Sequence, residues 1–373
     1  MTSELSSLCS YAKGKVSVDT LSKRNYVSTE NMMPNKGGIV DAGALPSAQY
    51  TQQYIKDDIL VSNIRPYFKK IWMADDDGGC SNDVLVFRAD RGCDSTFLYY
   101  ILANDAFFNY ASATSKGTKM PRGDKTAIMQ YKVPCFNYET QLRIGKLLRS
   151  IDDRIAVNKK INDNLQQQAA ALFSSLYDRS NTEVRFTDLI QILGGGTPKT
   201  GENTYWNGNI AFFTPKDVGI PYTLITEKTI SKEGLSHCNS RLYPVNTVFV
   251  TARGTVGKVG MSGVPMAMNQ SCYALVGKET HQLLVYFYTL KAVDRLKHKA
   301  SGAVFDAITT RDFESEQIMK LSDDDATAFL RVAEPMFQEV LNNNIENLRL
   351  STLRDSLLPK LMSGEIDVSA VQL

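Results

Sequence analysis

The sequence predicts an α+β protein in which two globular mixed α/β domains are separated by two long antiparallel coiled-coil helices, with a pseudo-two-fold internal repeat. Three observations predict this. A chain of 373 residues is long enough for two domains with their own cores. A shift of 185 positions aligns the end of one half of the chain with the end of the other. Short strands and turns precede a long helical pattern in both halves. The expected boundaries are 1–136 for the first domain, 137–180 for the first helix, 181–322 for the second domain, 323–364 for the second helix and 365–373 for a C-terminal tail.

The two helices are predicted by heptad patterns that match under the shift. Segment 138–177 falls on 323–362, and Gly117, further upstream, falls on Gly302. Apolar residues occupy the a and d positions in both segments, two asparagines interrupt both patterns at equivalent places, and Arg354 alone breaks the match. The residues expected at the helix-pair interface are Ile144, Leu148, Ile151, Ile155, Asn158, Asn162, Leu165, Leu172 and Leu176 in the first helix and Met336, Val340, Asn343, Asn347, Leu350, Leu357 and Leu361 in the second.

The matched asparagines favour pairing of the two helices with each other, because a buried amide needs a polar partner across the seam. Two amphipathic helices packed separately on their own domains are the alternative. A helix of about 40 residues would be roughly 60 Å long. Pro335 requires either a kink or a later start of the second helix. The run Leu357-Leu358-Pro359-Lys360-Leu361-Met362 has more apolar residues than one seam needs, which suggests a docking surface for another subunit.

Each domain is expected to contain a strand followed by a basic loop. Asp58-Ile59-Leu60-Val61-Ser62 is followed by Arg65, Lys69 and Lys70, and Thr247-Val248-Phe249-Val250-Thr251 is followed by Arg253 and Lys258. A second strand is predicted at 84–87 and at 272–276, and a helix at 97–110 and at 282–298. The same order of elements in both halves extends the repeat beyond the helices.

The basic loops are the candidate DNA-binding elements. The formal net charge of +2 is too small to indicate nucleic-acid binding, so the indication has to come from local clusters. Lys and Arg bind phosphates, Arg also binds guanine, and Asn or Gln can pair with adenine. The candidate DNA-binding residues are Asn63, Arg65, Lys69, Lys70, Lys116, Lys119, Arg122, Lys199, Lys216, Arg253, Lys258, Asn269 and Gln270.

No catalytic, metal-binding or cofactor-binding set is expected. Six scattered cysteines without a Cys-x-x-Cys pair and three histidines indicate reduced thiols, not a zinc site. The triple glycine at 194–196 lacks the Lys-Ser/Thr ending of a phosphate-binding P-loop and reads as a loop. Asp75-Asp76-Asp77 beside Gly78-Gly79 reads as a turn, and Asp323-Asp324-Asp325 as a helix start. Without a signal peptide or a long apolar run, a cytoplasmic protein that does not contact a membrane is expected.

Several segments resemble one known family over essentially the whole chain. They are Gly195-Gly196-Thr197-Pro198, Tyr205-Trp206-Asn207-Gly208-Asn209-Ile210, Lys216-Asp217, Gly234-Leu235, Arg253-Gly254-Thr255-Val256-Gly257-Lys258 and Asn269-Gln270 in the second half, and Asp58-Ile59-Leu60-Val61-Ser62-Asn63-Ile64-Arg65-Pro66 and Asp83-Val84-Leu85-Val86 in the first. Together they resemble the specificity (S) subunits of type I restriction-modification systems. The first half departs from the family pattern because it lacks the Gly-Gly-Thr-Pro opening.

The resemblance implies a non-catalytic subunit whose two target-recognition domains each read one half of a bipartite double-stranded DNA target. The helix pair would set the separation of the half-sites. The implied partners are methyltransferase (M) subunits, two in number, which methylate adenine, and restriction (R) subunits, which translocate and cut DNA. A self-contained adenine methyltransferase is disfavoured because no Pro-Pro-Tyr loop occurs in the chain.

The alternative from another class is a coiled-coil scaffold that binds proteins and never contacts DNA. Substitution of Arg253 and Lys258 separates the two hypotheses, since only a DNA reader would lose DNA binding while its complex stays intact.

Overall fold

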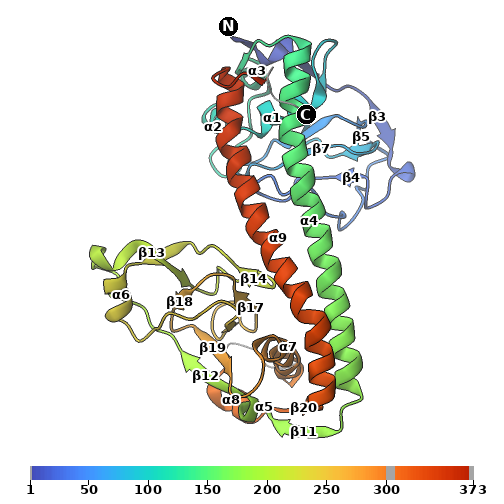
Figure 1. Cartoon of the computed structure of the whole chain (residues 1–373). Coiled ribbons are helices and arrows are strands. Elements are labelled where there is room, and N and C mark those ends of the chain that lie inside the picture. Colours follow the sequence, from blue (N-terminus) through green and yellow to red (C-terminus); the bar gives the residue numbers. More distant parts are fainter. Residues whose placement is uncertain (1, 300–306, 369–373) are drawn as a thin grey trace. The chain divides into compact units, whose positions relative to one another are not determined.

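Two helices of 41 residues each, α4 (Tyr138–Asp178) and α9 (Asp323–Ser363), run through the computed structural model, which describes residues 2–299 and 307–368 (Figure 1). The chain divides into two compact units. Unit 1 comprises residues 1–155 and 349–373, and unit 2 comprises residues 156–348. Each unit therefore contains a stretch of both long helices.

Unit 1 is a mixed α/β structure built on two four-stranded sheets. One sheet has the order β2-β9-β6-β7 and the other β3-β5-β8-β4, while β1 pairs with β10. The strands are β1 (Thr2–Glu4), β2 (Cys9–Tyr11), β3 (Lys15–Ser17), β4 (Tyr26–Val27), β5 (Tyr50–Tyr54), β6 (Ile59–Ser62), β7 (Ile71–Met73), β8 (Gly78–Cys80), β9 (Val84–Ala89) and β10 (Lys132–Pro134). The helices before α4 are η1 (Leu5–Ser7), η2 (Val18–Thr20), η3 (Pro66–Phe68), α1 (Ser95–Ala103), α2 (Asp105–Ala113) and α3 (Lys125–Met129).

Unit 2 has a related architecture, with a five-stranded sheet β12-β19-β16-β17-β14, a three-stranded sheet β15-β13-β18 and the pair β11-β20. Its strands are β11 (Thr182–Arg185), β12 (Ile190–Gly194), β13 (Trp206–Phe213), β14 (Tyr222–Thr223), β15 (Lys228–Ile230), β16 (Val248–Thr251), β17 (Val259–Ser262), β18 (Met266–Met268), β19 (Cys272–Gly277) and β20 (Gln317–Lys320). Its shorter helices are α5 (Phe186–Leu189), η4 (Asn203–Tyr205), α6 (Lys232–Ser236), α7 (Gln282–Lys299) and α8 (Thr310–Glu314).

The sheets repeat the same pairing in both units. The order β2-β9-β6-β7 corresponds to β12-β19-β16-β17, with antiparallel neighbours throughout. In the second sheet the parallel pair β4-β8 corresponds to β13-β18. The predicted strands at 58–62, 84–87, 247–251 and 272–276 are confirmed as β6, β9, β16 and β19. The predicted α+β class with an internal repeat is thus confirmed.

The long helices pack antiparallel to each other within each unit. In unit 2, Asn158 bonds Asn347 and Asn162 bonds Asn343, so rising numbers in α4 meet falling numbers in α9. In unit 1, buried side chains of the same two helices share one apolar cluster that contains Ile144, Leu148, Leu358 and Leu361. The helices are thus paired with each other, in addition to packing on the sheets and helices of their own unit.

Of the two possibilities at Pro335, a later start of the second helix is excluded, because α9 begins at the expected residue, Asp323, and continues through Pro335. Another local expectation was wrong. The helix predicted at 97–110 is two helices, since Asn104 is extended (ψ 139°) and its side chain accepts a bond from the Ala106 amide to cap α2. Asp75 and Asp76 form a bend between β7 and β8, as expected, and the neighbouring Gly78-Gly79 lies in strand β8.

The apolar residues at the end of the second helix pack within unit 1, which corrects the expectation of an exposed apolar surface there. Leu358, Leu361 and Met362 are buried in the main core of unit 1. The observation that suggested a docking surface there is therefore explained by the protein's own packing. Gly302, the expected counterpart of Gly117, lies outside the described residues.

No helix in residues 2–299 and 307–368 has the length and apolarity needed to cross a membrane.

Candidate nucleic-acid interface

The loop between β6 and β7 and the hairpin at 116–122 form one surface in unit 1. The Arg65 amide donates to the Pro121 carbonyl at 2.8 Å, and the Gly123 amide donates to the Asn63 carbonyl at 3.1 Å. Lys116 and Arg122 bond each other through their backbones at 2.8 and 2.9 Å and close the hairpin. The structure therefore brings together two basic segments that lie some fifty residues apart in the sequence.

Most cations of this surface are paired with carboxylates. Lys69 lies 2.8 Å from Asp105, whose second partner is Lys36 at 2.9 Å. Lys116 lies 2.5 Å from Asp124, and Arg122 lies 3.0 Å from Asp83. Hydrogen bonds from Lys69 and then Lys36 hold the pKa of the Asp105 carboxyl below its ordinary value, and Lys116 does the same for Asp124.

These pairs are at least partly exposed and hold the loops in shape at modest energetic gain. Phosphates can compete with the carboxylates for the lysines, because both are oxygen anions. Among the described residues, no carboxylate pairs with Lys119, which is exposed. The Lys70 ammonium donates to the Thr29 carbonyl at 2.6 Å, which links the β6–β7 loop to the segment that contains Thr29.

Asn63 departs from the expectation of a base-reading amide. Its residue is only 7% exposed, and no described group bonds its side-chain oxygen. A Cβ atom at Gly123 would lie 2.9 Å from that oxygen, so the close approach of the hairpin covers it. Asn63 therefore faces the loop junction instead of solvent, and the neighbouring Arg65 is half-buried with its Nε unpartnered in the described structure.

In unit 2 three of the six predicted residues line a cavity of about 550 Å³. Lys216, Arg253 and Asn269 line it, and they come from three different loops. Gln270 is placed beside it through a hydrogen bond from Thr197, another lining residue. Four of the predicted residues are thus brought to one place by the fold.

Lys258 and Lys199 are placed differently. Lys258 lines a separate cavity beside α4 and α7, together with Lys297. Lys199 contributes its carbonyl oxygen, which accepts a 3.1 Å bond from the Trp206 indole, and its side chain is exposed. The structure does not join these two side chains to the Arg253 group.

Close backbone packing positions the unit 2 loops. A Cβ atom at Gly195 would lie 2.2 Å from the Asn269 carbonyl oxygen, and one at Gly196 would lie 2.6 Å from the Asn239 nitrogen. Only glycine permits this approach. The Asp217 carboxylate fixes the neighbouring loop by accepting the amides of Thr214 at 2.8 Å and Glu227 at 2.7 Å. Gly195 and Gly196 therefore form a structural loop, as the sequence indicates, whereas Gly194 ends strand β12.

Sequence reasoning missed the aromatic residues of both surfaces. Trp206 and Phe212 line the unit 2 cavity with their rings 5.5 Å apart, and the Lys228 ammonium lies 5.5 Å from the Trp206 ring. In unit 1, Tyr67 and Phe68 are 52% and 39% exposed. The sequence signal that could have found Tyr67 and Phe68 is their position between the predicted basic residues Arg65 and Lys69.

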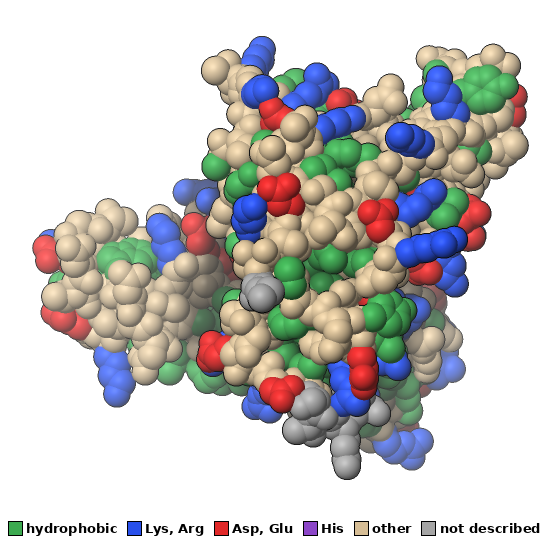
Figure 2. All heavy atoms as spheres, turned by 90° about the horizontal axis from the view of Figure 1, so that it is seen from above, with side chains coloured by type: hydrophobic (Ala, Val, Ile, Leu, Met, Phe, Trp, Pro, Cys, Tyr) green, Lys and Arg blue, Asp and Glu red, His purple; other side chains and the backbone are tan. Residues whose placement is uncertain are grey.

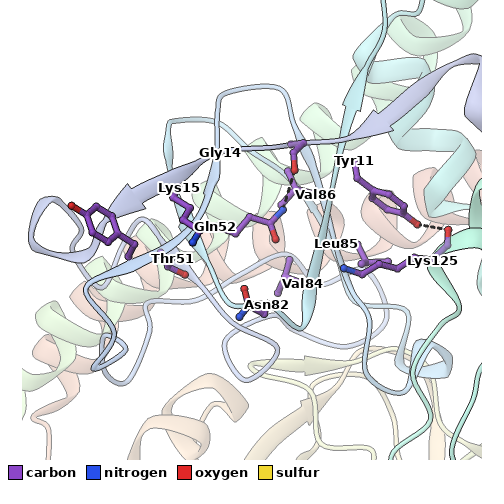
Figure 3. Close-up of a pocket in the computed structure, with 12 residues that line it drawn as sticks. Tyr11, Gly14, Lys15, Thr51, Gln52, Asn82, Val84, Leu85, Val86 and Lys125 are labelled. Atoms are coloured by element: carbon purple, nitrogen blue, oxygen red, sulfur yellow. Dashed lines mark hydrogen bonds between the residues drawn. The ribbon is translucent and has the colours of Figure 1, made fainter.

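A polar cavity of about 430 Å³ in unit 1 adds two further lysines (Figure 3). Lys15 and Lys125 line it with Gln52, Asn82 and Tyr11, and the Tyr11 hydroxyl donates to the Lys125 carbonyl at 3.0 Å. Both lysines are exposed. Lys125 and Asn82 are close in sequence to the Arg122–Asp83 pair, but none of the residues of the β6–β7 loop or of the hairpin at 116–122 lines this cavity.

The face seen in Figure 2 does not form one basic field. The face in Figure 2 shows Lys and Arg side chains interspersed with Asp, Glu and apolar side chains. This agrees with the formal net charge of +2. Any binding of a polyanion therefore depends on the local loop surfaces described above.

The residues predicted for the helix-pair interface are all buried or half-buried. Ile144, Leu148, Ile151, Ile155, Asn158, Asn162, Leu176, Val340, Asn343, Asn347 and Leu361 are buried, and Leu165, Leu172, Met336, Leu350 and Leu357 are half-buried. The Asn158 amide donates to Asn347 at 3.0 Å and to Glu346 at 2.7 Å, and Asn343 donates to Asn162 at 2.9 Å. The shift of 185 converts Asn158–Asn347 into Asn343–Asn162, so this polar layer has the symmetry of the repeat.

Arg354, the charged residue in the helix seam, is paired with a carboxylate. The Arg354 guanidinium lies 2.6 Å from Asp152, whose other oxygen accepts a 2.6 Å bond from the Tyr100 hydroxyl. Burial works against the charged form of Arg354, but the Asp152 and Asp355 carboxylates together outweigh it and raise the pKa of Arg354.

In residues 2–299 and 307–368, no three His, Cys, Asp or Glu side chains are grouped to hold a metal ion. All six cysteines are free thiols in the structure, and burial raises the pKa of Cys80 and Cys272 to about 12.

Comparison with known proteins decides the family. The family model described as the type I restriction modification DNA specificity domain matches residues 1–167 and 179–320, which is most of the chain. The chain belongs to this family. As a type I specificity subunit, it carries two copies of the domain, one ending within α4 and the other ending with β20.

Two curated relatives match different shares of the chain. The specificity subunit of the type I restriction enzyme HindI from Haemophilus influenzae is 24% identical, over 91% of this chain and 94% of its own. The specificity subunit of EcoR124I/EcoR124II from Escherichia coli is 29% identical over 42% of each chain. The crystal structure of the S subunit of a type I system from M. genitalium has a similar fold, with a TM-score of 0.65 and 16% identity over 97% of this chain and 96% of that one.

Proposed function

We propose that this specificity subunit reads a bipartite double-stranded DNA target in the cytoplasm, with unit 1 reading one half-site and unit 2 the other. The paired helices α4 and α9 would set the distance between the half-sites. The chain itself would perform no chemistry. It would recruit two methyltransferase subunits, which methylate adenine within the target, and restriction subunits, which cut DNA.

The observation that carries this proposal is the repetition of a loop surface in both units. The β6–β7 loop of unit 1 and the β16–β17 loop of unit 2 join corresponding strands, and each presents an arginine, Arg65 or Arg253, next to further cations. Two related surfaces on one chain suit two separate stretches of one duplex, much as dimeric DNA readers use two half-sites.

The side chains of these surfaces suit DNA chemically. Lys216 and Lys119 can bind phosphates, whereas Arg253, Asn269 and Gln270 can bond base edges in the major groove. Arg253 and Gln270 are exposed and Asn269 is half-buried, so all three are accessible. The half-buried Arg65 and the buried Asn63 are better suited to shaping the unit 1 loop than to reading bases.

The proposal is tested by co-expressing the chain with candidate methyltransferase subunits and mapping adenine methylation on random-sequence DNA. The expected result is a motif with two defined halves and a fixed gap, which is lost when the chain is omitted. Methylation that is absent, or unchanged without the chain, would favour the scaffold that binds proteins only.

A second measurement separates DNA reading from complex assembly. Lys216→Ala and Arg253→Ala together should weaken DNA binding of the assembled complex and lower the slope of log affinity against log salt by about one or two. The complex itself should form with unchanged yield. Arg311→Ala is the matched control, because Arg311 is an exposed cation of α8 that lines neither unit 2 cavity described above. Equal DNA affinity for both variants would contradict the proposed interface.

A further inference from the structure

Two adjacent aromatic side chains lie exposed in the unit 1 loop surface. Tyr67 and Phe68 end the short helix η3, and 52% and 39% of their surfaces are accessible to solvent. Their ring centroids are 4.8 Å apart. Aromatic rings contribute most when both faces are covered, so an exposed adjacent pair indicates a partner with flat apolar surfaces of its own.

The turn that carries the rings is fixed from two sides. Arg65 and Lys69, which flank η3, both have left-handed backbones with φ of 50° and 52°. The Asn35 amide donates to the Phe68 carbonyl and the Lys36 amide to the Lys69 carbonyl, both at 2.8 Å. Non-glycine residues keep such conformations only where their surroundings determine them. The rings are therefore presented on a preorganised turn, which loses little conformational freedom on binding.

Cations surround the aromatic pair. The turn and the segments bonded to it carry Lys36, Arg65, Lys69, Lys70, Lys116, Lys119 and Arg122. Three carboxylates, Asp83, Asp105 and Asp124, pair with four of these seven cations. A partner that offers both flat apolar faces and many negative charges is a nucleic acid, since base pairs supply the faces and phosphates the charges.

The corresponding loop of unit 2 lacks this feature. The β16–β17 loop contains Arg253-Gly254-Thr255-Val256-Gly257, without an aromatic residue, and borders the 550 Å³ cavity instead. The aromatic pair is thus specific to unit 1, so its effect on DNA should be confined to one of the two half-sites.

We infer that Tyr67 and Phe68 form a wedge that enters between two base pairs of the half-site read by unit 1 and partly unstacks them. The inference rests on the proposed function. Ring-on-base contacts replace part of the lost base stacking, while the surrounding lysines and arginines hold the phosphates on either side. Because base steps differ in how easily they unstack, the wedge selects sequence at a step where no hydrogen bond is made to a base.

The inference is tested on the assembled complex with a duplex that carries the target found by methylation mapping. Donor and acceptor dyes flank each half-site in turn, and energy transfer reports a kink. The wild-type complex should kink the DNA at one half-site only. Tyr67→Ala/Phe68→Ala should abolish that kink and weaken binding by about tenfold or more. Tyr138→Ala, which removes a 53% exposed ring at the start of α4, should change neither.

Each outcome decides one of the two ideas. If the wild-type complex shows no bipartite target, the proposed function fails. If the target is found but Tyr67→Ala/Phe68→Ala binds and bends it like the wild type, the wedge alone is refuted. If that variant loses its methyltransferase partners while its DNA affinity is unchanged, the rings contact protein and the wedge is refuted as well. Tyr67→Leu/Phe68→Leu should retain part of the kink, because leucine side chains can also enter a base step, and a retained kink shows that replacing both rings does not by itself misfold the loop.

Discussion

The Asp152–Arg354 ion pair marks the place where the two halves of the helix seam differ. The shift of 185 maps Arg354 onto Ala169 and Asp152 onto Phe337, both of which are buried in the apolar core of unit 2. In unit 1 the pair is joined by the Tyr100 hydroxyl instead. We expect Arg354→Ala to destabilise unit 1, because it leaves the half-buried Asp152 carboxylate without its cation.

The magnitude follows from the exposure of the pair. The side chains of Arg354 and Asp152 are 25% and 26% exposed. Exposed pairs contribute up to about 1 kcal/mol, and breaking a fully buried pair costs roughly 3–5 kcal/mol. We therefore expect about 2 kcal/mol for Arg354→Ala. A double-mutant cycle with Asp152→Ala should give a coupling free energy of about 1–2 kcal/mol.

The assay uses the position of the two tryptophans. Trp72 lies in β7 of unit 1 and Trp206 in unit 2, so a Trp206→Phe background leaves one fluorescence reporter in unit 1. The free energy of unfolding is then measured by urea titration. Arg349→Ala, at an exposed arginine of the same helix, is the matched control and should change stability by less than about 0.5 kcal/mol. Equal losses for Arg354→Ala and Arg349→Ala would refute the reasoning.

Three further predictions concern the polar layer, the glycine loop and the pH dependence. Asn162→Leu should lower the free energy of unfolding by about 1–3 kcal/mol because it strands Asn343, and Asn162→Leu/Asn343→Leu should recover most of the loss in the same titration. Gly195→Ala should weaken DNA binding because its Cβ would lie 2.2 Å from the carbonyl oxygen of the β18–β19 turn, whereas Gly194→Ala, with no atom within 4 Å, should bind normally. The pKa of the Asp105 carboxyl is lowered in the folded state, so its contribution to stability is complete above the unfolded-state pKa of about 3.9 and is lost as the pH falls through the folded-state pKa. Asp105→Asn should therefore flatten the dependence of the free energy of unfolding on pH in that acidic range.

The long helices could be predicted from the sequence because their information is local and periodic. The heptad spacing from Ile144 to Leu176 needs no knowledge of distant residues, and the observed bounds, Tyr138–Asp178 and Asp323–Ser363, lie close to those expected. The pairing of the two long helices with each other could also be predicted, since Asn158 and Asn343 occupy equivalent positions and a buried amide needs an amide opposite it.

Other features depend on contacts that no local pattern encodes. The burial of Asn63 results from the approach of Gly123, sixty residues further along the chain. The strand at Gly78-Gly79 forms because β8 pairs with β5 and β4, where a side chain at Gly78 would collide with the Asn25 carbonyl at 2.2 Å. Pairing partners of this kind overrode the turn preference of glycine.

The candidate interface was predictable in part. Lys216, Arg253 and Asn269 were singled out by residue type and by their place after strands, and the fold brings them to one cavity. Trp206 and Phe212 were missed because aromatic residues in strands ordinarily belong to the core. Only the cavity shows that these rings and the cations share one surface.

The proposed function requires each unit to read its own half of the target. The most direct test compares methylation motifs of complexes that carry Lys216→Ala/Arg253→Ala in unit 2 or Lys119→Ala/Arg122→Ala in unit 1. We expect the unit 2 variant to relax the motif in one half and the unit 1 variant to relax the other half, while the gap between the halves stays the same in both. Relaxation of the same half by both variants, or a changed gap, would contradict the proposed function.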